Sequence, residues 1–505
     1  MANVSRRFFI GGLASAFALG PRRIFAAPPG SFVGGAPALS FGVLSDVHMA
    51  FKKGGKVLSE NYDTRTIVKA FEWFRDNGAD AVVIAGDMAH WGLAGELQAV
   101  ADAWFGVFPN DTAPDGRHVE RVFVFGNHDW SGMGRARRII ADEALCREQL
   151  LQADPRKWWR RIFHEEWSPI FEKTVKGYHF ECAHWCNGWC NGKSEKFLKG
   201  DLQAHYAKCG KSLDPSLPFF HVQHPHPRGT VHGASVWGQD DGVTPKVLSA
   251  YPNAVTFSGH SHTSLTDEKS IWQGAFTAVG CGSLRDVSLN IATGVAQLPG
   301  GSENAKTPSG ANFDECNSVK TMAVPDRMNC RQGQLVRVYA DRVVFTRREF
   351  VAGMPLGDDL VMPLPAAEKR PFEFEARAAK ARAPEFPQGA KLLLKRSTAT
   401  TRGGKKSRKG KVDVWALSIP AANAVRTARA VRYDITVAAA GEAPRAFSML
   451  VEGARFSAKD PRANASETFT VACDRVPGGD AVFSVRAVSC WGRTSRPISV
   501  STSKA

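Results

Sequence analysis

Short runs of β-branched and aromatic residues recur along the first half of the chain, and a polar residue follows each of them. Their near-continuous apolar character is typical of strands that are buried on both faces of a sheet. The five runs that we predict to be strands are residues 41–45, 81–85, 122–125, 219–223 and 255–258. Between the first two, Ile67, Phe71 and Phe74 repeat at helical spacing, which predicts a crossover helix. We place its ends at Asp63 and Gly78, and the strand, helix, strand order predicts an α/β fold with parallel pairing.

The pattern loosens between the third and fourth strands, where we assign an insertion to residues 131–218. It contains short basic helices, one of them predicted over residues 135–152. An insertion of this length between two strands usually covers a site at the strand ends, so we interpret it as a cap. We expect its tryptophans to form a small local core and not a substrate platform. They are Trp158, Trp159, Trp167, Trp185 and Trp189.

Alternating segments follow the fifth strand, at residues 275–279, 335–339 and 342–347. They predict antiparallel strands that finish a second sheet. We therefore assign the first domain to residues 38–355. Residues 356–387 carry prolines, alanines and charges without periodicity, and we interpret them as a linker.

The last part of the chain, residues 388–505, has short alternating runs separated by turn residues, which is typical of a β-sandwich. The runs that we predict as strands are residues 412–419, 431–437, 447–451, 468–471 and 482–488. The hairpin from Phe483 to Gly492, followed by Ser495-Arg496-Pro497, resembles the last hairpin of fibronectin type III domains. The stretch Arg402 to Lys411 holds six basic residues. We interpret it as a loop tip, and the alternative is contact with an anionic surface.

The N-terminus has the features of an export signal. Arg6 and Arg7 precede a weakly apolar run without acidic residues, and we assign residues 1–27 to a twin-arginine-type signal peptide. The formal net charge of +16 falls to +12 without this segment, because it contains four arginines and no acid. Such a surplus attracts anions, although it is usually only a solvating surface. We expect an exported protein of the periplasm or cell envelope, and not an integral membrane protein, because no later segment is apolar enough to span a bilayer.

Ten cysteines in an exported chain permit disulfides. Four of them cluster in one segment, at Cys182, Cys186, Cys190 and Cys209. Cys316 and Cys330 bracket a loop, and Cys473 and Cys490 lie on neighbouring predicted strands of the last domain. The spacing of Cys182, Cys186 and Cys190, with His179 and His184 beside them, also suits a structural zinc ion. We expect disulfides, with zinc as the alternative.

Each of the five strands in the first domain ends in a block of potential metal ligands. The blocks are Asp46-Val47-His48, Gly86-Asp87, Gly126-Asn127-His128-Asp129, His224-Pro225-His226 and Gly259-His260-Ser261-His262. Open α/β sheets place their sites at the carboxyl ends of the strands, so we expect these blocks to meet. Asp, His and Asn side chains suit a pair of divalent or trivalent cations such as manganese, iron or zinc. Water held between two such ions is a nucleophile at neutral pH.

The order of the blocks resembles that of the calcineurin-like metallophosphoesterases, over about residues 39–350. The resemblance implies a two-sheet α/β/β/α sandwich, with a two-metal centre that hydrolyses phosphomonoesters or phosphodiesters. The ligands that it implies are Asp46, His48 and His262 for one ion, Asn127, His224 and His260 for the other, and Asp87 as a bridge between them. His226 remains the alternative to His224, because the family's block usually reads His-x-Pro and this chain has a proline after both histidines.

The same resemblance implies that His128 protonates or stabilises the leaving oxygen and that Asp129 orients it. His90 and Arg228 are further candidates for substrate contacts. We expect an exported phosphoesterase in which a bridging hydroxide attacks phosphorus. The alternative is a non-catalytic envelope protein that binds anionic polymers. Nuclease activity on nucleic acid is a weaker alternative, because the basic residues do not interleave with aromatic residues around the blocks.

Overall fold

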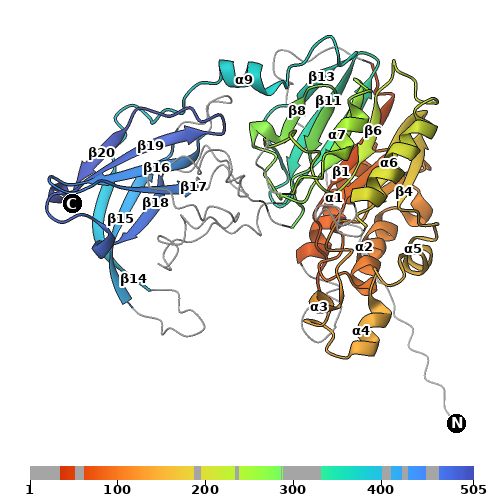
Figure 1. Ribbon diagram of the computed structural model, residues 1–505, viewed down its shortest axis with the longest axis horizontal. Coiled ribbons are helices and arrows are strands. Elements are labelled where there is room, and N and C mark those ends of the chain that lie inside the picture. The colour runs from red at the N-terminus through yellow and green to blue at the C-terminus, as the bar shows by residue number, and fades with distance from the viewer. Residues whose placement is uncertain are drawn as a thin grey trace, which may run out of the picture. The chain divides into compact units, whose positions relative to one another are not determined.

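The computed structural model contains an α/β region with two sheets, followed by a region of antiparallel strands (Figure 1). It describes residues 35–51, 62–186, 195–233, 238–285, 287, 331–400, 411–422, 430–450 and 466–505. The signal predicted at residues 1–27, and the basic stretch up to residue 410, lie outside these ranges. None of the helices in the described ranges is both long enough and apolar enough to cross a membrane.

Three parallel strands that the sequence predicted form the centre of the first sheet. They are β1 (Leu39–Leu44), β2 (Ala81–Ala85) and β3 (Glu120–Val124). The predicted crossover helix is α1 (Tyr62–Asp76), which connects β1 to β2, and α2 (Ala94–Val107) connects β2 to β3. Every residue of β1 and β2 is buried, as expected for strands that are covered on both faces.

Four antiparallel strands extend this sheet on the side of β1. They are β10 (Gln332–Tyr339), β11 (Arg342–Glu349), β12 (Met354–Pro355) and β13 (Leu360–Pro363). We predicted that the segments within β10 and β11 would finish a second sheet, and this was wrong. Because β10 pairs directly with β1, the two strands complete the first sheet instead.

The second sheet has six strands, in the order β4-β5-β6-β7-β9-β8. Their bounds are β4 (Ile170–Val175), β5 (Tyr178–Ala183), β6 (Phe219–Val222), β7 (Ala254–Ser258), β8 (Ile271–Gln273) and β9 (Thr277–Gly280). The four inner strands are parallel, and β4 and β8 are antiparallel edges. Within the segment 131–218, β4 and β5 belong to this sheet and not to a cap, and a cap formed by the rest of the segment stays a prediction.

Phenylalanines fill the space between the two sheets. The ring of Phe41, on β1, makes edge-to-face contacts with Phe180, Phe220 and Phe257 of the second sheet, at centroid distances of 4.7–5.6 Å. All four side chains are fully buried. Aromatic pairs of this kind contribute about 0.5–1.5 kcal/mol each beyond the burial of their surface. Because this core fills the space between the sheets, it fixes the distance between the strand ends of one sheet and those of the other.

Helices cover the outer faces of both sheets. On the first sheet, α1, α2 and α5 (Pro155–Phe163) share one buried core. Trp158, Trp159 and Trp167 belong to that core, so they extend the main domain and do not form the separate local core that we predicted. On the second sheet, residues of α6 (Glu195–Cys209) and α7 (Val243–Leu248) pack in another buried cluster. The result is the α/β/β/α sandwich that the sequence indicated.

The helix predicted at residues 135–152 is two helices. These are α3 (Met133–Ala136) and α4 (Glu143–Gln149). The second starts afresh because the side chain of Asp142 accepts a hydrogen bond from the backbone of Leu145 as an N-cap.

The predicted linker at residues 356–387 is partly integrated into the first domain. Its β13 pairs with β11, and Ala366 and Phe372 pack in the core between the sheets. A short helix, α9 (Phe374–Lys380), follows. The prediction failed here because single apolar residues among prolines and charged residues show no periodicity. Ala366 and Phe372 nevertheless pack in the core between the sheets.

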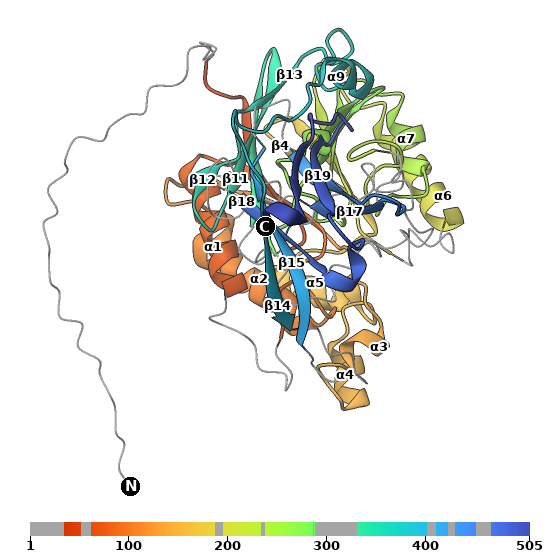
Figure 2. The same cartoon turned by 90° about the vertical axis from the view of Figure 1, so that its left-hand side faces the viewer.

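The C-terminal region consists of two antiparallel sheets around a common apolar core. One sheet has the order β14-β15-β18, with β14 and β15 side by side in Figures 1 and 2, and the other has the order β17-β16-β19-β20. Their bounds are β14 (Leu393–Thr400), β15 (Lys411–Pro420), β16 (Ala430–Ala438), β17 (Arg445–Leu450), β18 (Ser466–Ala472), β19 (Val482–Ser489) and β20 (Ile498–Ser501). The predicted sequence of short strands is confirmed, although β14 and β20 were not predicted. The likeness to fibronectin type III domains stays a prediction.

No disulfide joins any two of the seven cysteines in the described ranges. Cys182 packs between the two sheets, whereas Cys186 packs in the core below α1 and α2. Their side chains therefore point into different cores and do not converge on a zinc site. Cys190, Cys316 and Cys330 lie outside the described ranges, and Cys473 and Cys490 are not bonded to each other.

Candidate metal centre

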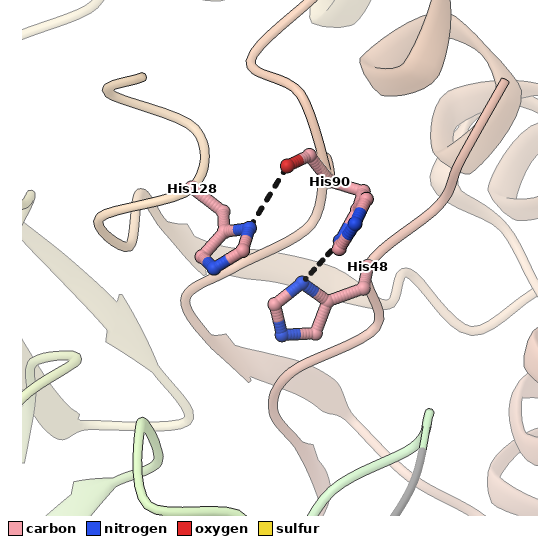
Figure 3. A group of neighbouring side chains, drawn as sticks. All are labelled: His48, His90 and His128. Atoms are coloured by element: carbon pink, nitrogen blue, oxygen red, sulfur yellow. Dashed lines mark hydrogen bonds between the residues drawn. The ribbon is translucent and has the colours of Figure 1, made fainter. Parts of the chain in front are cut away.

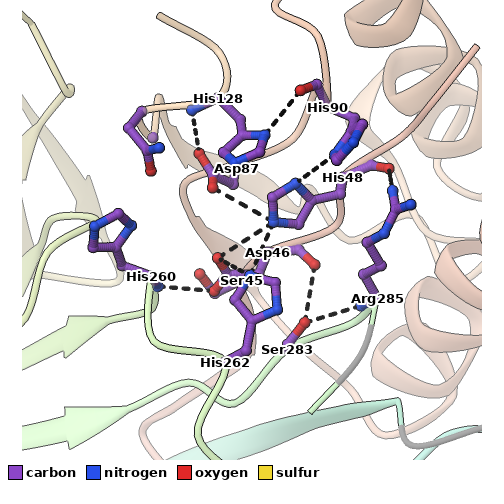
Figure 4. A network of polar contacts seen from close by, with 12 residues as sticks. Ser45, Asp46, His48, Asp87, His90, His128, His260, His262, Ser283 and Arg285 are labelled. Atoms are coloured by element: carbon purple, nitrogen blue, oxygen red, sulfur yellow. Dashed lines mark hydrogen bonds and ion pairs between the residues drawn. The ribbon is translucent and has the colours of Figure 1, made fainter. Parts of the chain in front are cut away.

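The predicted ligand blocks follow the carboxyl ends of neighbouring parallel strands. Asp46 follows β1 and Asp87 follows β2, while Asn127 comes after β3. On the second sheet His224 follows β6, and His260 follows β7. Since the two sheets pack face to face, these two rows of loops meet at one end of the sandwich, where Figure 4 shows the side chains converging.

Five of the predicted ligands have a strained backbone. Their φ angles are positive, at 52° for Asp46, 48° for His48, 54° for Asp87, 71° for His260 and 55° for His262. This region favours glycine, and non-glycine residues held in it cluster at functional sites. Backbone hydrogen bonds maintain the turns, from the N–H of Asp46 to the carbonyl of Gly86 and from the N–H of His48 to the carbonyl of Asp87. The strain turns the side chains toward one point.

Two glycines of the blocks allow the loops to approach each other. A Cβ atom on Gly126 would collide with the carboxylate and backbone of Asp87. A Cβ atom on Gly259 would collide with the side chains of Ser45 and Asp46. The glycines are therefore needed for space at the centre, and their loops could not close around larger residues.

One ligand group consists of Asp46, His48 and His262. The Nε2 atom of His262 lies 3.1 Å from Asp46 Oδ1 and 3.0 Å from His48 Nε2. Each of the three residues offers one potential ligand atom, and these three atoms all lie within 4.8 Å of one another. Convergence of two imidazole nitrogens and a carboxylate oxygen is a suitable arrangement for a transition-metal cation.

The second group consists of Asp87, His224 and His260, which also lie within 4.8 Å of one another. The Nε2 atom of His224 is 3.3 Å from Asp87 Oδ2 and 3.1 Å from His260 Nδ1. The Nδ1 atom of His224 donates to the carbonyl of Ala85 at 2.7 Å. In the neutral ring this bond leaves Nε2 as the lone-pair nitrogen, which is the tautomer that a metal ligand needs. Burial lowers the pKa of His224, but the carboxylates of Asp87 and Asp46 outweigh it and raise the pKa to about 9, so a cation at Nε2 would take the place of a proton.

The alternative ligand, His226, is engaged elsewhere. Its Nδ1 atom is 2.8 Å from the hydroxyl of Ser258, and its Nε2 atom is 2.7 Å from the hydroxyl of Ser261. The side chain is buried and uses both ring nitrogens in these bonds. The geometry therefore favours His224 at the centre.

Two buried oxygen atoms could bind a cation and accept no hydrogen bond. Asp46 Oδ1 and Asn127 Oδ1 make no hydrogen bond to any described residue. A buried polar atom without a partner costs about 1–3 kcal/mol, so native proteins rarely retain one without a reason. Each atom belongs to a different ligand set implied by the sequence. Cations in both sets would satisfy both atoms.

The charges of the centre are those of a site prepared for cations. Burial alone would raise the pKa of Asp87. The electrostatic attraction of His224 and His128 is stronger than this effect, and it holds the pKa below its ordinary value. Burial lowers the pKa of His48, and it lowers that of His260 to about 3. The carboxylate is thus ionised and these two imidazoles are neutral at pH 7, as ligands must be.

His128 and His90 lie beside the first ligand group (Figure 3). His128 donates from Nδ1 to the backbone carbonyl of His90 at 2.8 Å, and His90 Nδ1 is 3.2 Å from His48 Nδ1. We predicted that Asp129 orients His128, and the structure corrects this. The Asp129 carboxylate instead accepts from the backbone N–H groups of three loop residues, which are Met88, Ala89 and Gly126. It ties the second and third blocks together.

The hydrogen bonds of Arg228 go to residues outside the ligand groups, and two other arginines lie near those groups. Arg228 contacts Asp240 through its backbone and the carbonyl of Asp241 through its side chain. Arg285 donates to the carbonyl of His48 at 2.8 Å, next to the ligands in Figure 4. Arg135 interacts electrostatically with His128. Arg285 was not among the site residues predicted from the sequence, although its position shortly after the end of β9 was a usable signal.

Two facing sheets with metal ligands at their strand ends define the metallophosphoesterase fold. In agreement with this, residues 39–264 match the family model described as calcineurin-like phosphoesterase. The chain therefore contains a calcineurin-like phosphoesterase domain, and the fold that the sequence predicted is confirmed. No curated protein matches the chain.

Several solved structures match the chain at low sequence identity. A dimetal phosphatase from Danio rerio is 13% identical, over 65% of this chain and 99% of that one, with a TM-score of 0.31. GAP50 of Plasmodium, the anchor in the inner membrane complex, is 11% identical, over 68% and 93%, with a TM-score of 0.37. The purple acid phosphatase PPD1 from yellow lupin (Lupinus luteus) seeds is 12% identical, over 65% and 55%, with a TM-score of 0.38.

Proposed function

We propose that this protein is a metal-dependent hydrolase of phosphoric esters. The observation that carries the proposal is the position of Asp87 between the two ligand groups. Its Oδ2 atom lies 3.5 Å from Nε2 of His48 in one group and 3.3 Å from Nε2 of His224 in the other. Two cations held close together repel each other, and a shared carboxylate offsets that repulsion. The oxygens of Asp46 and Asn127 that accept no hydrogen bond support the same proposal.

Two cations of the manganese, iron or zinc type would supply Lewis acidity and a nucleophilic water of lowered pKa. The chain's own residues would then bind and orient the ester. Arg135 and Arg285 place positive charge beside the histidines, where it attracts the phosphoryl group. His90 lies between His48 and His128 and borders the same space.

His128 is the residue that we propose as proton donor to the leaving oxygen. Burial lowers the pKa of His128 to about 4, so its imidazole is neutral at pH 7. An anionic phosphoryl group beside the ring would favour the charged form and raise this pKa. Substrate binding would therefore favour protonation of the His128 ring, which could then donate this proton to the leaving oxygen.

The direct test offers the purified protein p-nitrophenyl phosphate and bis-p-nitrophenyl phosphate, with and without manganese. We expect metal-dependent release of p-nitrophenol from at least one of them, and the preferred ester identifies a mono- or diesterase. A protein that binds metal and releases product from neither ester would contradict the proposal. That outcome would favour the alternative, a non-catalytic protein that binds anionic polymers.

We also propose export through the N-terminal segment. Its support is the sequence alone, since Arg6 and Arg7 precede a weakly apolar run. The test replaces both arginines by lysine and measures how much protein reaches the periplasm. We expect a loss of export, whereas the matched replacement of Arg22 and Arg23 should have little effect. Equal export of both variants would refute the twin-arginine assignment.

A further inference from the structure

A second group of potential ligands lies on the outer face of the second sheet, away from the strand ends. Glu172 on β4 and Glu181 on β5 are directly opposite each other in the antiparallel register, so their side chains share a face. Like charges in this position destabilise a sheet. Glu181 is also fully buried, and its Oε1 atom has no hydrogen-bond partner in the described part of the chain.

The helix α6 brings two more donors to this carboxylate. His205 and Cys209 are four residues apart near its end, so they lie on the same face of the helix. The Nε2 atom of His205 contacts Oε2 of Glu181. One donor atom from each of Glu181, His205 and Cys209 lies within 4.8 Å of the other two.

We propose that Glu181, His205 and Cys209 bind a divalent transition-metal ion, with zinc as the best match. A carboxylate, an imidazole and a thiolate are three of the usual zinc donors. Tetrahedral zinc places its ligand atoms about 3.3–3.8 Å apart, so Nε2 of His205 and Oε2 of Glu181, which are now in direct contact, would separate slightly to admit the ion. Glu172 or His179, which form an overlapping group with Glu181, would lie next to the fourth position.

The charges around the site agree with its geometry. Burial, followed by the charges of Glu181 and Glu172, raises the pKa of the Cys209 thiol to about 12. The surroundings are therefore anionic, and they favour any cation that enters. Binding would displace the thiol proton to solvent, and the thiolate would then coordinate the ion.

A metal-free ion pair between Glu181 and His205 explains less. It leaves the Cys209 thiol as only a weak hydrogen-bond donor to the buried carboxylate, whose Oε1 atom has no other partner among the described residues. A metal ion satisfies both and ties α6 to the sheet. This inference does not depend on the phosphoesterase activity, because none of the three residues belongs to the ligand groups at the strand ends.

The test uses the full chain with its metals removed and replaced by cobalt(II). A cobalt ion bound by a thiolate has a charge-transfer absorption in the near ultraviolet, and the centre at the strand ends has no cysteine among its predicted ligands. We expect the band in the unaltered protein and its loss in Cys209→Ala. Cys281→Ala is the matched control, because Cys281 is a buried thiol that interacts electrostatically with Asp46 of the other centre. This variant should keep the band.

His205→Ala provides a second test that does not disturb a buried core residue, because this side chain is 19% exposed. It should weaken cobalt binding at the site by more than about 10-fold, since even outer-shell losses cost that much. Absence of the band in the unaltered protein, its survival in Cys209→Ala, or unchanged affinity in His205→Ala would each overturn the proposal.

Discussion

The backbone N–H of His128 donates to Oδ1 of Asp87 at 2.7 Å, while Oδ2 of the same carboxylate faces His48 and His224. One carboxylate therefore joins the loop that carries His128 to both ligand groups. Any change in the position of Asp87 is transmitted to the backbone of His128.

Asp87→Asn is expected to abolish phosphoesterase activity while the protein remains folded. The amide is neutral, so it cannot offset the repulsion between two cations, although it can still accept from His128. We expect turnover to fall by more than about 10²-fold, beyond the usual loss for an outer-shell partner. Metal content by mass spectrometry and circular dichroism would be measured alongside activity. The exposed Asp76→Asn is the control, and unchanged turnover in Asp87→Asn would refute the shared-ligand assignment.

His128→Ala is expected to lower kcat by about 10²–10⁴-fold, with normal metal content. The loss should be larger for esters with poor leaving groups, because these depend most on proton transfer to the leaving oxygen. Comparison of p-nitrophenyl and alkyl phosphates measures this dependence. His118→Ala, at an exposed side chain, is the control. Equal losses for both kinds of ester would show that His128 is not the proton donor.

Gly126→Ala is expected to weaken metal binding and activity by steric collision alone. Its Cβ atom would collide with Asp87, and the backbone at Gly126 has no positive φ that alanine would strain. Gly134→Ala is the matched control, because its Cβ atom meets no atom within 4 Å. Metal affinity and thermal unfolding would be compared in both variants. Full metal affinity in Gly126→Ala would contradict the close approach of the two loops.

His184 is expected to make the protein sensitive to acid. It is fully buried among aromatic rings and accepts from the backbone N–H of Phe125 at 2.8 Å. Burial lowers its pKa from 6.5 to about 3. Between these pH values the unfolded chain binds a proton that the folded protein does not. The free energy of unfolding should therefore fall by about 1.4 kcal/mol per pH unit as the pH decreases through this window.

The measurement is urea unfolding of the unaltered protein and of His184→Asn at pH 7 and pH 5. The asparagine can accept the same hydrogen bond and does not titrate, so its free energy of unfolding should depend less on pH. His118→Asn should behave like the unaltered protein. The explanation fails if His184→Asn loses as much stability between the two pH values as the unaltered protein does.

Much of the first domain was predictable because its signals are local. The apolar runs before Asp46 and Asp87 are short, buried and β-branched, and the polar block after each one marks where the strand ends. The errors arose where a segment obtains its partners from distant parts of the chain. The pattern of apolar and polar residues in β10 would be the same in either sheet. Only its pairing with β1 shows that it belongs to the first sheet.

The sequence by itself determined which residues are able to bind metal, because residue type and strand position are local properties. Only the tertiary structure decided which of them meet. It distinguished His224 from His226 by their hydrogen bonds, replaced Asp129 by the carbonyl of His90 as the partner of the His128 ring, and brought Glu181 to Cys209. The physical reason is that contacts between side chains depend on the packing of elements far apart in the chain, which no local pattern specifies.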